Sequence, residues 1–110
     1  MKSEDKIQSE IFQWFWNTYP KYLIHAVPNG GSRNVLEAMK MKATGTVAGI
    51  ADLIIWLPNG KAVMCEVKNA KNDQQPAQKK IEAKMKAMNS NYILVRSLSE
   101  FKEKIKTFLP

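Results

Sequence analysis

Residues 51–68 have the sequence ADLIIWLPNGKAVMCEVK, and this stretch decides the fold. It contains two apolar runs, 51–57 and 62–68, separated by the triplet Pro58-Asn59-Gly60. Two such runs joined by a short loop with proline and glycine are typical of a β-hairpin. Proline suits the first position of a type I turn, and glycine suits the position at which φ must be positive. We therefore predict a hairpin with a three-residue loop.

The loop length sets which residues of the two strands face each other. A three-residue loop makes its two flanking residues the first pair of the hairpin. Counting five residues along each strand from that pair places Asp52 opposite Glu66, with Cβ atoms about 5 Å apart. Lys68 shares this face because it lies two residues beyond Glu66. A two-residue loop would instead place Val67 opposite Asp52, so the predicted cluster depends on the turn.

The rest of the chain predicts a mixed α/β domain in which helices pack on a small sheet. Helical spacing, capping residues and turn residues mark the elements. In chain order we expect a helix capped by Ser3 and running to about Tyr19, a strand from Tyr22 to Val27, an inserted helix capped by Ser32 and running to about Ala43 with Val35, Leu36 and Met39 as its apolar side, the hairpin, a helix from about Gln74 to Met88, a strand from Tyr92 to Arg96, and a final helix capped by Ser97. One domain spans 1–110.

The first predicted helix is apolar on two sides. One side carries Ile7, Ile11, Trp14, Phe15 and Thr18, and the nearly opposite side carries Phe12, Trp16 and Tyr19. Two apolar sides need two partners, of which the sheet is one. Either a second subunit or inserted residues of the same chain would cover the other side.

The charge balance favours a polyanionic partner. Seventeen Lys and Arg residues face ten Asp and Glu residues, which gives a net charge of +7. A basic surface attracts nucleic acids, although it also serves solubility. Cys65 is the only cysteine, so no internal disulfide forms, and with the single His25 it cannot build a zinc site. With no apolar run of membrane-spanning length, we expect a cytoplasmic protein, in a bacterial or phage-infected cell.

The paired carboxylates point to metal chemistry. Asp52 and Glu66 lie among apolar strand residues, where two carboxylates repel each other unless they are protonated, paired or bound to a cation. Their hard oxygens suit Mg²⁺ or Mn²⁺, which would polarise a phosphodiester. Lys68 would orient or deprotonate a water molecule, or stabilise charge on the phosphate. The alternative is a structural ion pair between Glu66 and Lys68.

Several motifs around this cluster resemble a known family. They are the segment VPNGG at 27–31, the segment GTVAGIADL at 45–53, Glu66-Val67-Lys68, and a helix opening at Gln75 to Gln78. Asp52 followed by Glu-Val-Lys resembles the PD-(D/E)xK nuclease motif, and the surroundings resemble the virus-type replication-repair nuclease (VRR-NUC) domain. The resemblance covers nearly the whole chain. One departure is Ala51, where the family usually has proline.

The resemblance implies a restriction-endonuclease-like αβββαβ core with an inserted helix after the first strand and a C-terminal helix. It also implies that Asp52, Glu66 and the Val67 carbonyl bind Mg²⁺ or Mn²⁺, that Lys68 is the catalytic lysine, and that Glu10 is a further acidic ligand. Glu10 lies at the border of the apolar and polar sides of its helix, so a solvated glutamate is the alternative.

Further residues are candidates for catalysis or for DNA contacts. Gln78 matches the family's glutamine on the helix after the lysine strand, where it would support the site or touch DNA. His25 stands alone among apolar neighbours, which favours a structural role over a catalytic one. A basic helix face is usually only solvated, but beside a nuclease site it becomes a candidate phosphate track. The DNA-binding candidates are Asn29, Gly30, Arg33, Lys40, Lys42 and Lys79.

The function that this resemblance implies is a metal-dependent endonuclease acting on branched DNA. Stand-alone domains of the family are typically homodimers that resolve four-way (Holliday) junctions. Three alternatives stay open: a module of the same fold that grips structured DNA without cutting, a nuclease acting on linear DNA ends or RNA, and a basic protein whose carboxylates are only structural.

Overall fold

A single four-stranded sheet forms the centre of the protein. The computed structural model describes residues 1–28 and 34–110. The strands follow one another across the sheet in chain order; β2 pairs antiparallel with both β1 and β3, whereas β4 runs parallel to β3. The strands are β1 (Leu23–Ala26), β2 (Leu53–Trp56), β3 (Ala62–Val67) and β4 (Asn91–Val95).

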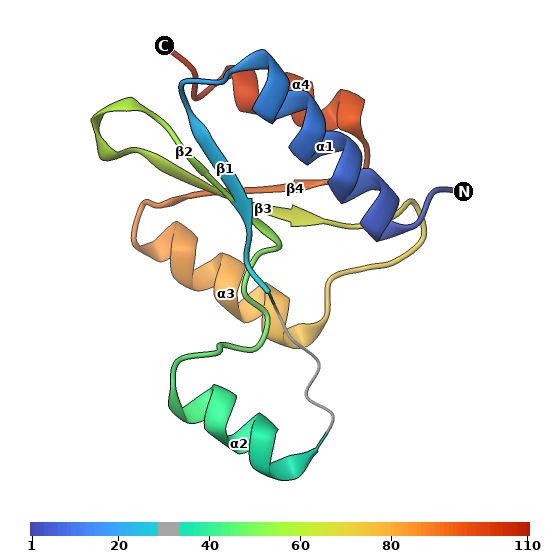
Figure 1. Cartoon of the computed structure of the whole chain (residues 1–110), viewed down its shortest axis with the longest axis vertical. Coiled ribbons are helices and arrows are strands. Elements are labelled where there is room, and N and C mark those ends of the chain that lie inside the picture. Colours follow the sequence, from blue (N-terminus) through green and yellow to red (C-terminus); the bar gives the residue numbers. More distant parts are fainter. Residues whose placement is uncertain (29–33) are drawn as a thin grey trace.

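Helices cover both faces of the sheet. Helices α1 (Glu4–Thr18) and α4 (Leu98–Lys106) pack side by side on one face, whereas α3 (Pro76–Ala87) lies on the other (Figure 1). Helix α2 (Val35–Ala43) stands at the far end of the molecule, away from the sheet (Figure 1). This arrangement confirms the predicted α/β class, the predicted order of elements and the inserted helix. Among the described residues, no helix is long and apolar enough to cross a membrane.

The hairpin has the predicted register with a different turn. The Leu57 N–H donates to the Lys61 carbonyl at 2.8 Å, and the strand pairing continues from Trp56–Ala62 to Leu53–Cys65. The positive φ expected at Gly60 is confirmed at 74°, but the expected type I turn is wrong, because Asn59 also has a positive φ, of 66°. Asparagine tolerates this left-handed conformation better than most non-glycine residues. The loop still has three residues, and the number of loop residues sets the register, so the register is unchanged.

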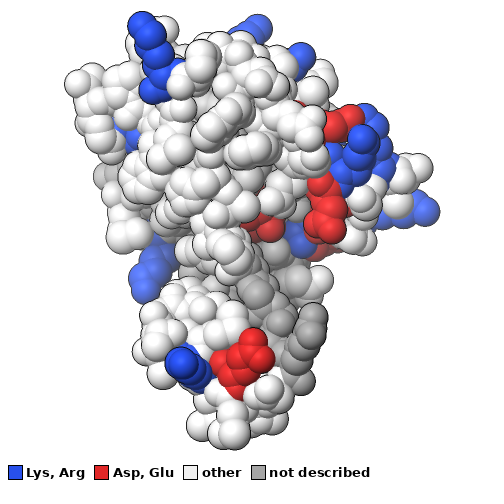
Figure 2. Space-filling model, viewed as in Figure 1, with Lys and Arg blue, Asp and Glu red and all other residues white. Residues whose placement is uncertain are grey.

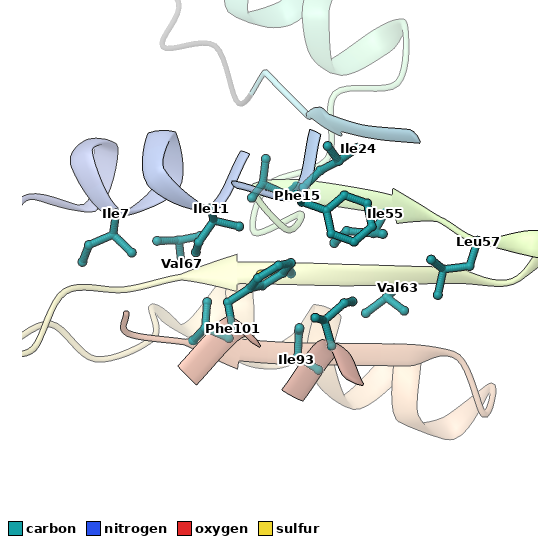
Figure 3. Packing of buried hydrophobic residues seen from close by; sticks show 14 residues of the cluster. Ile7, Ile11, Phe15, Ile24, Ile55, Leu57, Val63, Val67, Ile93 and Phe101 are labelled. Carbon is teal, nitrogen blue, oxygen red and sulfur yellow. The ribbon is translucent and has the colours of Figure 1, made fainter. Parts of the chain in front are cut away.

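The core lies between the sheet and the pair of helices α1 and α4. Alternate strand residues point into it because successive side chains of a strand face opposite sides of the sheet. Figure 3 shows these side chains meeting the buried faces of the two helices. Its main members are Ile7, Ile11 and Phe15 of α1, Ile24 of β1, Leu53 and Ile55 of β2, Val63, Cys65 and Val67 of β3, Ile93 and Val95 of β4, and Phe101 and Ile105 of α4.

Helices α1, α2 and α4 each begin at a residue whose side chain caps the helix, and two of the three caps predicted from the sequence are confirmed. Ser3 accepts a hydrogen bond from the Lys6 N–H, and Ser97 accepts one from the Glu100 N–H. Helix α2 is the exception, because Asn34 caps it by accepting from Glu37. The predicted cap, Ser32, lies outside the described residues.

The predicted apolar side of α2 does not pack, whereas on α3 Ala77, Ile81 and Met85 are half-buried as expected. Val35 and Leu36 of α2 are 74% and 79% exposed, and Met88, expected inside, is exposed at the end of α3. Helix α2 buries none of its residues because it extends beyond the sheet. On the second side of α1, Phe12 stacks on Trp16, which is 49% exposed, so α2 does not cover that side.

Candidate active site

The two predicted carboxylates lie on the α3 face of the sheet. Leu53 and Cys65 are a cross-strand pair that points into the core, so the next pair along, Asp52 and Glu66, points to the opposite face. Hydrogen-bonded and non-hydrogen-bonded pairs alternate along the hairpin from the bonded Leu57–Lys61 pair, which makes Asp52–Glu66 a non-hydrogen-bonded pair. Side chains approach most closely at such pairs. The register thus brings the two carboxylates together.

Glu66 is a buried carboxyl group with one unused oxygen. Its side chain is only 1% exposed, and Gln78 of α3 donates from Nε2 to Glu66 Oε2 at 2.9 Å. Glu66 Oε1 is buried and has no hydrogen-bond partner among the described residues. Burial raises the pKa of Glu66 from 4.5 to about 9, and a hydrogen bond that the protonated acid shares with the Asp52 carboxyl and the charge of Asp52 add to the effect. A buried acid in this state stays protonated at neutral pH unless a cation replaces its proton.

Asp52 is held at the end of β2 by the backbone of its neighbours. Its Oδ2 accepts the Val67 N–H at 2.8 Å, and its own carbonyl accepts the Val27 N–H at 2.9 Å. The side chain therefore occupies the place that a strand carbonyl would take if β2 continued. This bond fixes the orientation of the Asp52 carboxylate beside Glu66.

Lys68 lies directly after β3, next to the carboxylate pair. Its N–H donates to the Val95 carbonyl at 3.0 Å, which continues the β3–β4 pairing, and the residue is only 6% exposed. Its ammonium lowers the pKa of Glu66, against the larger effect of burial. The ion pairs of the described residues do not include one between Lys68 and Glu66, so the structural ion pair considered from the sequence is not formed.

Gly49 allows Gln78 to reach Glu66. Gly49 has a φ of +83°, and a Cβ at this position would lie 2.4 Å from the carbonyl carbon and oxygen of Ala77 and 2.7 Å from the Gln78 nitrogen. The backbone before β2 therefore touches the first turn of α3, an approach that only glycine permits. Pro76 occupies that first turn, where its missing N–H costs little.

A second set of contacts holds the loop after Lys68. Arg96 at the end of β4 donates from Nη1 to the carbonyls of Asn69 at 2.6 Å and Asn72 at 2.7 Å. Glu4 Oε2 on α1 accepts from the Asn69 N–H at 3.4 Å and from Asn72 Nδ2 at 3.1 Å. The loop is thus tied to α1 and to β4, which limits the movement of the preceding lysine.

The structure does not bring Glu10 to the carboxylate pair. Glu10 forms an ion pair with Lys2 at 2.8 Å and lines a separate surface pocket with Arg96. The acidic residue of α1 whose charge reaches Glu66, raising its pKa, is Glu4. The sequence carried no signal to choose it, because an acidic residue in the first turn of a helix is already explained by the helix dipole.

The DNA-binding candidates are spread over the surface. Lys40 and Lys42 are exposed on α2, and Lys79 is exposed on α3, whereas Asn29, Gly30 and Arg33 lie outside the described residues. On the face shown in Figure 2, basic side chains are scattered along the outline rather than gathered in one stripe. Acidic and basic side chains lie together near the α1 side of this face. The described residues of this face therefore form no single basic patch on which a DNA backbone would concentrate.

His25 is the structural histidine that the sequence favours. Its Nε2 accepts from Trp56 Nε1 at 2.9 Å, and its Nδ1 lies 3.0 Å from the Ala26 carbonyl. These two contacts assign the proton to Nδ1 and occupy both ring nitrogens. On the α3 face the sequence offered no role for Tyr92, whose hydroxyl accepts from Gln74 at 3.3 Å. Burial and the charge of Glu66 raise the pKa of Tyr92, so its hydroxyl keeps its proton.

The residues present fit a divalent cation that shares its coordination with substrate. Among the described residues no group of three His, Cys, Asp or Glu side chains forms a closed metal cage. Mg²⁺ usually binds through one or two carboxylates together with waters and substrate phosphates. The unpartnered Glu66 Oε1 and the adjacent Asp52 carboxylate supply this kind of donor set.

The fold matches known structures over nearly its whole length. One solved structure, described as a VRR_NUC domain protein, has a TM-score of 0.76 at 22% identity, covering 98% of this chain and 88% of the other. Another, described as a VRR_NUC domain, has a TM-score of 0.66 at 18% identity, covering 96% of this chain and 97% of the other. No protein-family model and no curated protein matches the chain.

These likenesses define the class of the fold. The mixed four-stranded sheet with helices on both faces is the α/β architecture that these two solved structures share with the chain. More narrowly, the chain has the VRR-NUC fold, which confirms the resemblance inferred from its motifs.

Proposed function

We propose that the protein is a Mg²⁺- or Mn²⁺-dependent endonuclease that hydrolyses phosphodiesters of branched DNA. The observation that carries the proposal is the Asp52–Glu66 pair, in which a buried carboxylate oxygen accepts no hydrogen bond from the described residues and Lys68 lies two residues beyond Glu66, just after β3. Such a pair destabilises the fold unless a cation or a proton is held there, which is characteristic of a functional site. The nuclease-family fold supports the same function.

Each residue of the site has a separate task in this proposal. Asp52, Glu66 and the Val67 carbonyl would hold the metal ion, which supplies Lewis-acid stabilisation of phosphate oxygens and lowers the pKa of water. Lys68 would orient the attacking water and offset charge that builds on the phosphate. Gln78 fixes the orientation of the Glu66 carboxylate through its 2.9 Å hydrogen bond, so that the carboxylate would be ready to bind the ion. The Val67 N–H fixes the orientation of Asp52 in the same way.

We further propose that two copies act together on a four-way junction. A cavity of about 670 Å³ lies between α1 and the edge strand β1, lined by Phe12, Trp16 and Leu23 among others. Its walls are largely apolar, and the edge of β1 offers unpaired backbone groups that a second copy would cover. A two-fold pair of sites would make two symmetric cuts.

The test is cleavage of a labelled four-way junction beside a linear duplex of matched sequence, with Mg²⁺, Mn²⁺ or EDTA. We expect metal-dependent, symmetric cuts in the junction that are lost in Lys68→Ala. Lys106→Ala, which removes an exposed lysine on α4, is the matched control and should cut like the wild type. Equal cleavage of the junction and the linear duplex would refute junction specificity and indicate a nuclease that acts on duplex DNA or on DNA ends. Binding of the junction without cleavage under either metal would support a non-cleaving DNA-binding module.

The homodimer has its own test. Light scattering should show a mass of twice the 12.5 kDa chain for the wild type, and Trp16→Ser should shift the protein toward the single-chain mass. Trp16 is half exposed, so this change leaves the core intact. A wild type that stays at the single-chain mass at all concentrations used for cleavage would refute the homodimer.

A further inference from the structure

A pocket beside the candidate active site has no role in the chemistry described above. It has a volume of about 480 Å³ and lies between α2, the segment 46–50 and the first turn of α3. Its volume is within the range of small-molecule sites, roughly 300–1,000 Å³. Its wall includes Gln78, whose Nε2 donates to Glu66. One side chain therefore separates the pocket from the carboxylate pair.

The pocket wall suits a flat ring with a polar edge better than a phosphate. Alanine, methionine, valine and isoleucine side chains make up most of it, including Ala38, Met41 and Ala77. Gln75, Gln78 and Thr46 add amide and hydroxyl groups, and among the described residues of the lining Lys42 is the only charged one. Apolar surfaces stack on the faces of a nucleobase while polar groups bond to its edge, whereas an anion would be poorly compensated by one lysine.

The floor of the pocket is held in place by backbone contacts. The Gly49 backbone lies against the carbonyl of Ala77 and the nitrogen of Gln78, so the segment before β2 and the first turn of α3 form one surface. Gln78 Oε1 accepts the Gln75 N–H at 2.7 Å, which orients this amide toward Glu66. A ligand in the pocket would therefore meet a preformed wall whose position is linked to the catalytic carboxylates.

We propose that this pocket receives an unpaired nucleobase from the nucleotide next to the scissile phosphate. The inference rests on the proposed nuclease function, and it adds a reason for substrate choice. A base in intact duplex is stacked and paired, and extruding it costs a few kcal/mol, which is least where the base is already unpaired. Lys42 lines the pocket, and its ammonium group would pair with the phosphate of the bound nucleotide. The pocket thus selects DNA with an exposed base near the cut.

The experiment uses four-way junctions that each carry one 2-aminopurine, placed in turn at the nucleotides flanking the cut, with Ca²⁺ in place of Mg²⁺. Emission from 2-aminopurine rises when the base leaves the stack. We expect a severalfold rise at one position when the wild-type protein binds. Ala38→Leu, which fills part of the pocket from α2, should abolish the rise and weaken binding severalfold, because the pocket no longer holds the base. Ala48→Leu, from the opposite wall, should do the same.

The matched control is Ala43→Leu, the same change on the same helix outside the pocket lining. It should keep both the emission rise and the wild-type affinity. The pocket proposal fails if the wild type cuts the junction while every 2-aminopurine stays stacked, or if Ala38→Leu and Ala43→Leu behave alike. A wild type that neither binds nor cuts any junction instead refutes the nuclease function, and this inference with it.

Discussion

Glu66→Gln is expected to make the metal-free protein more stable at neutral and alkaline pH. Glutamine has nearly the same shape, keeps an acceptor for the Gln78 Nε2 and cannot ionise. In the wild type, the pKa of Glu66 is about 9 in the folded protein against an ordinary value of 4.5. Between these values the folded chain holds a proton that the unfolded chain has released. The contribution of Glu66 to stability is therefore fully present below pH 4.5 and is lost as the pH rises toward 9.

The size of the effect follows from the number of protons involved. One proton held only by the folded state lowers the free energy of unfolding by up to roughly 1.4 kcal/mol for each pH unit. From pH 5.5 to pH 7.5 the wild type should lose up to about 2.7 kcal/mol relative to Glu66→Gln. Titratable groups that the two proteins share contribute equally to both free energies of unfolding, so their effect drops out of the difference.

The assay is urea unfolding in EDTA at pH 5.5, 6.5, 7.5 and 8.5, followed by circular dichroism. Glu103→Gln makes the same change at an exposed position of α4 and should track the wild type at every pH. Adding Mg²⁺ should stabilise the wild type but not Glu66→Gln, because binding replaces the proton. A difference between wild type and Glu66→Gln that stays constant with pH would show that Glu66 is ionised in the metal-free fold, and the reasoning would be wrong.

Three further changes test how the site is supported. Gly49→Ala should lower stability by roughly 2 kcal/mol in urea unfolding, because the new Cβ would meet the Ala77 carbonyl at 2.4 Å, and cleavage should fall with it. Arg96→Met should cost about 2 kcal/mol, since two carbonyls lose charge-assisted hydrogen bonds, and hydrogen exchange should rise in the loop after Lys68. Glu10→Gln removes only a partly exposed ion pair, so stability should change by less than about 1 kcal/mol, and calorimetry should show unchanged Mg²⁺ affinity. A tenfold loss of affinity there would place Glu10 in the site after all.

Much of the site could be predicted because it is built from one hairpin. The register of Asp52 against Glu66 depends on the length of a loop between neighbouring strands, and loop length is read directly from residues 58–60. The change of turn conformation at Asn59 did not alter this result, because only the number of loop residues sets the pairing. The VRR-NUC resemblance rested on the same local motifs.

The supporting contacts were harder to predict because they join segments that are distant in the chain. Glu4 and Glu10 are both acidic residues on α1, and only the packing of that helix places the charge of Glu4 rather than Glu10 near Glu66. Similarly, the apolar residues of α2 suggested a packed side, yet the helix lies beyond the sheet and leaves them exposed.

What the amino-acid sequence specified was therefore everything that depends on near neighbours: the helix caps at Ser3 and Ser97, the hairpin register, and the shared face of Asp52 and Glu66. Only the tertiary structure decided how deeply Glu66 is buried and which residues reach it. Burial and long-range contacts come from the packing of α3 and of the segment at Gly49 against the sheet. Such packing depends on the shapes of many side chains at once, and no local pattern records it.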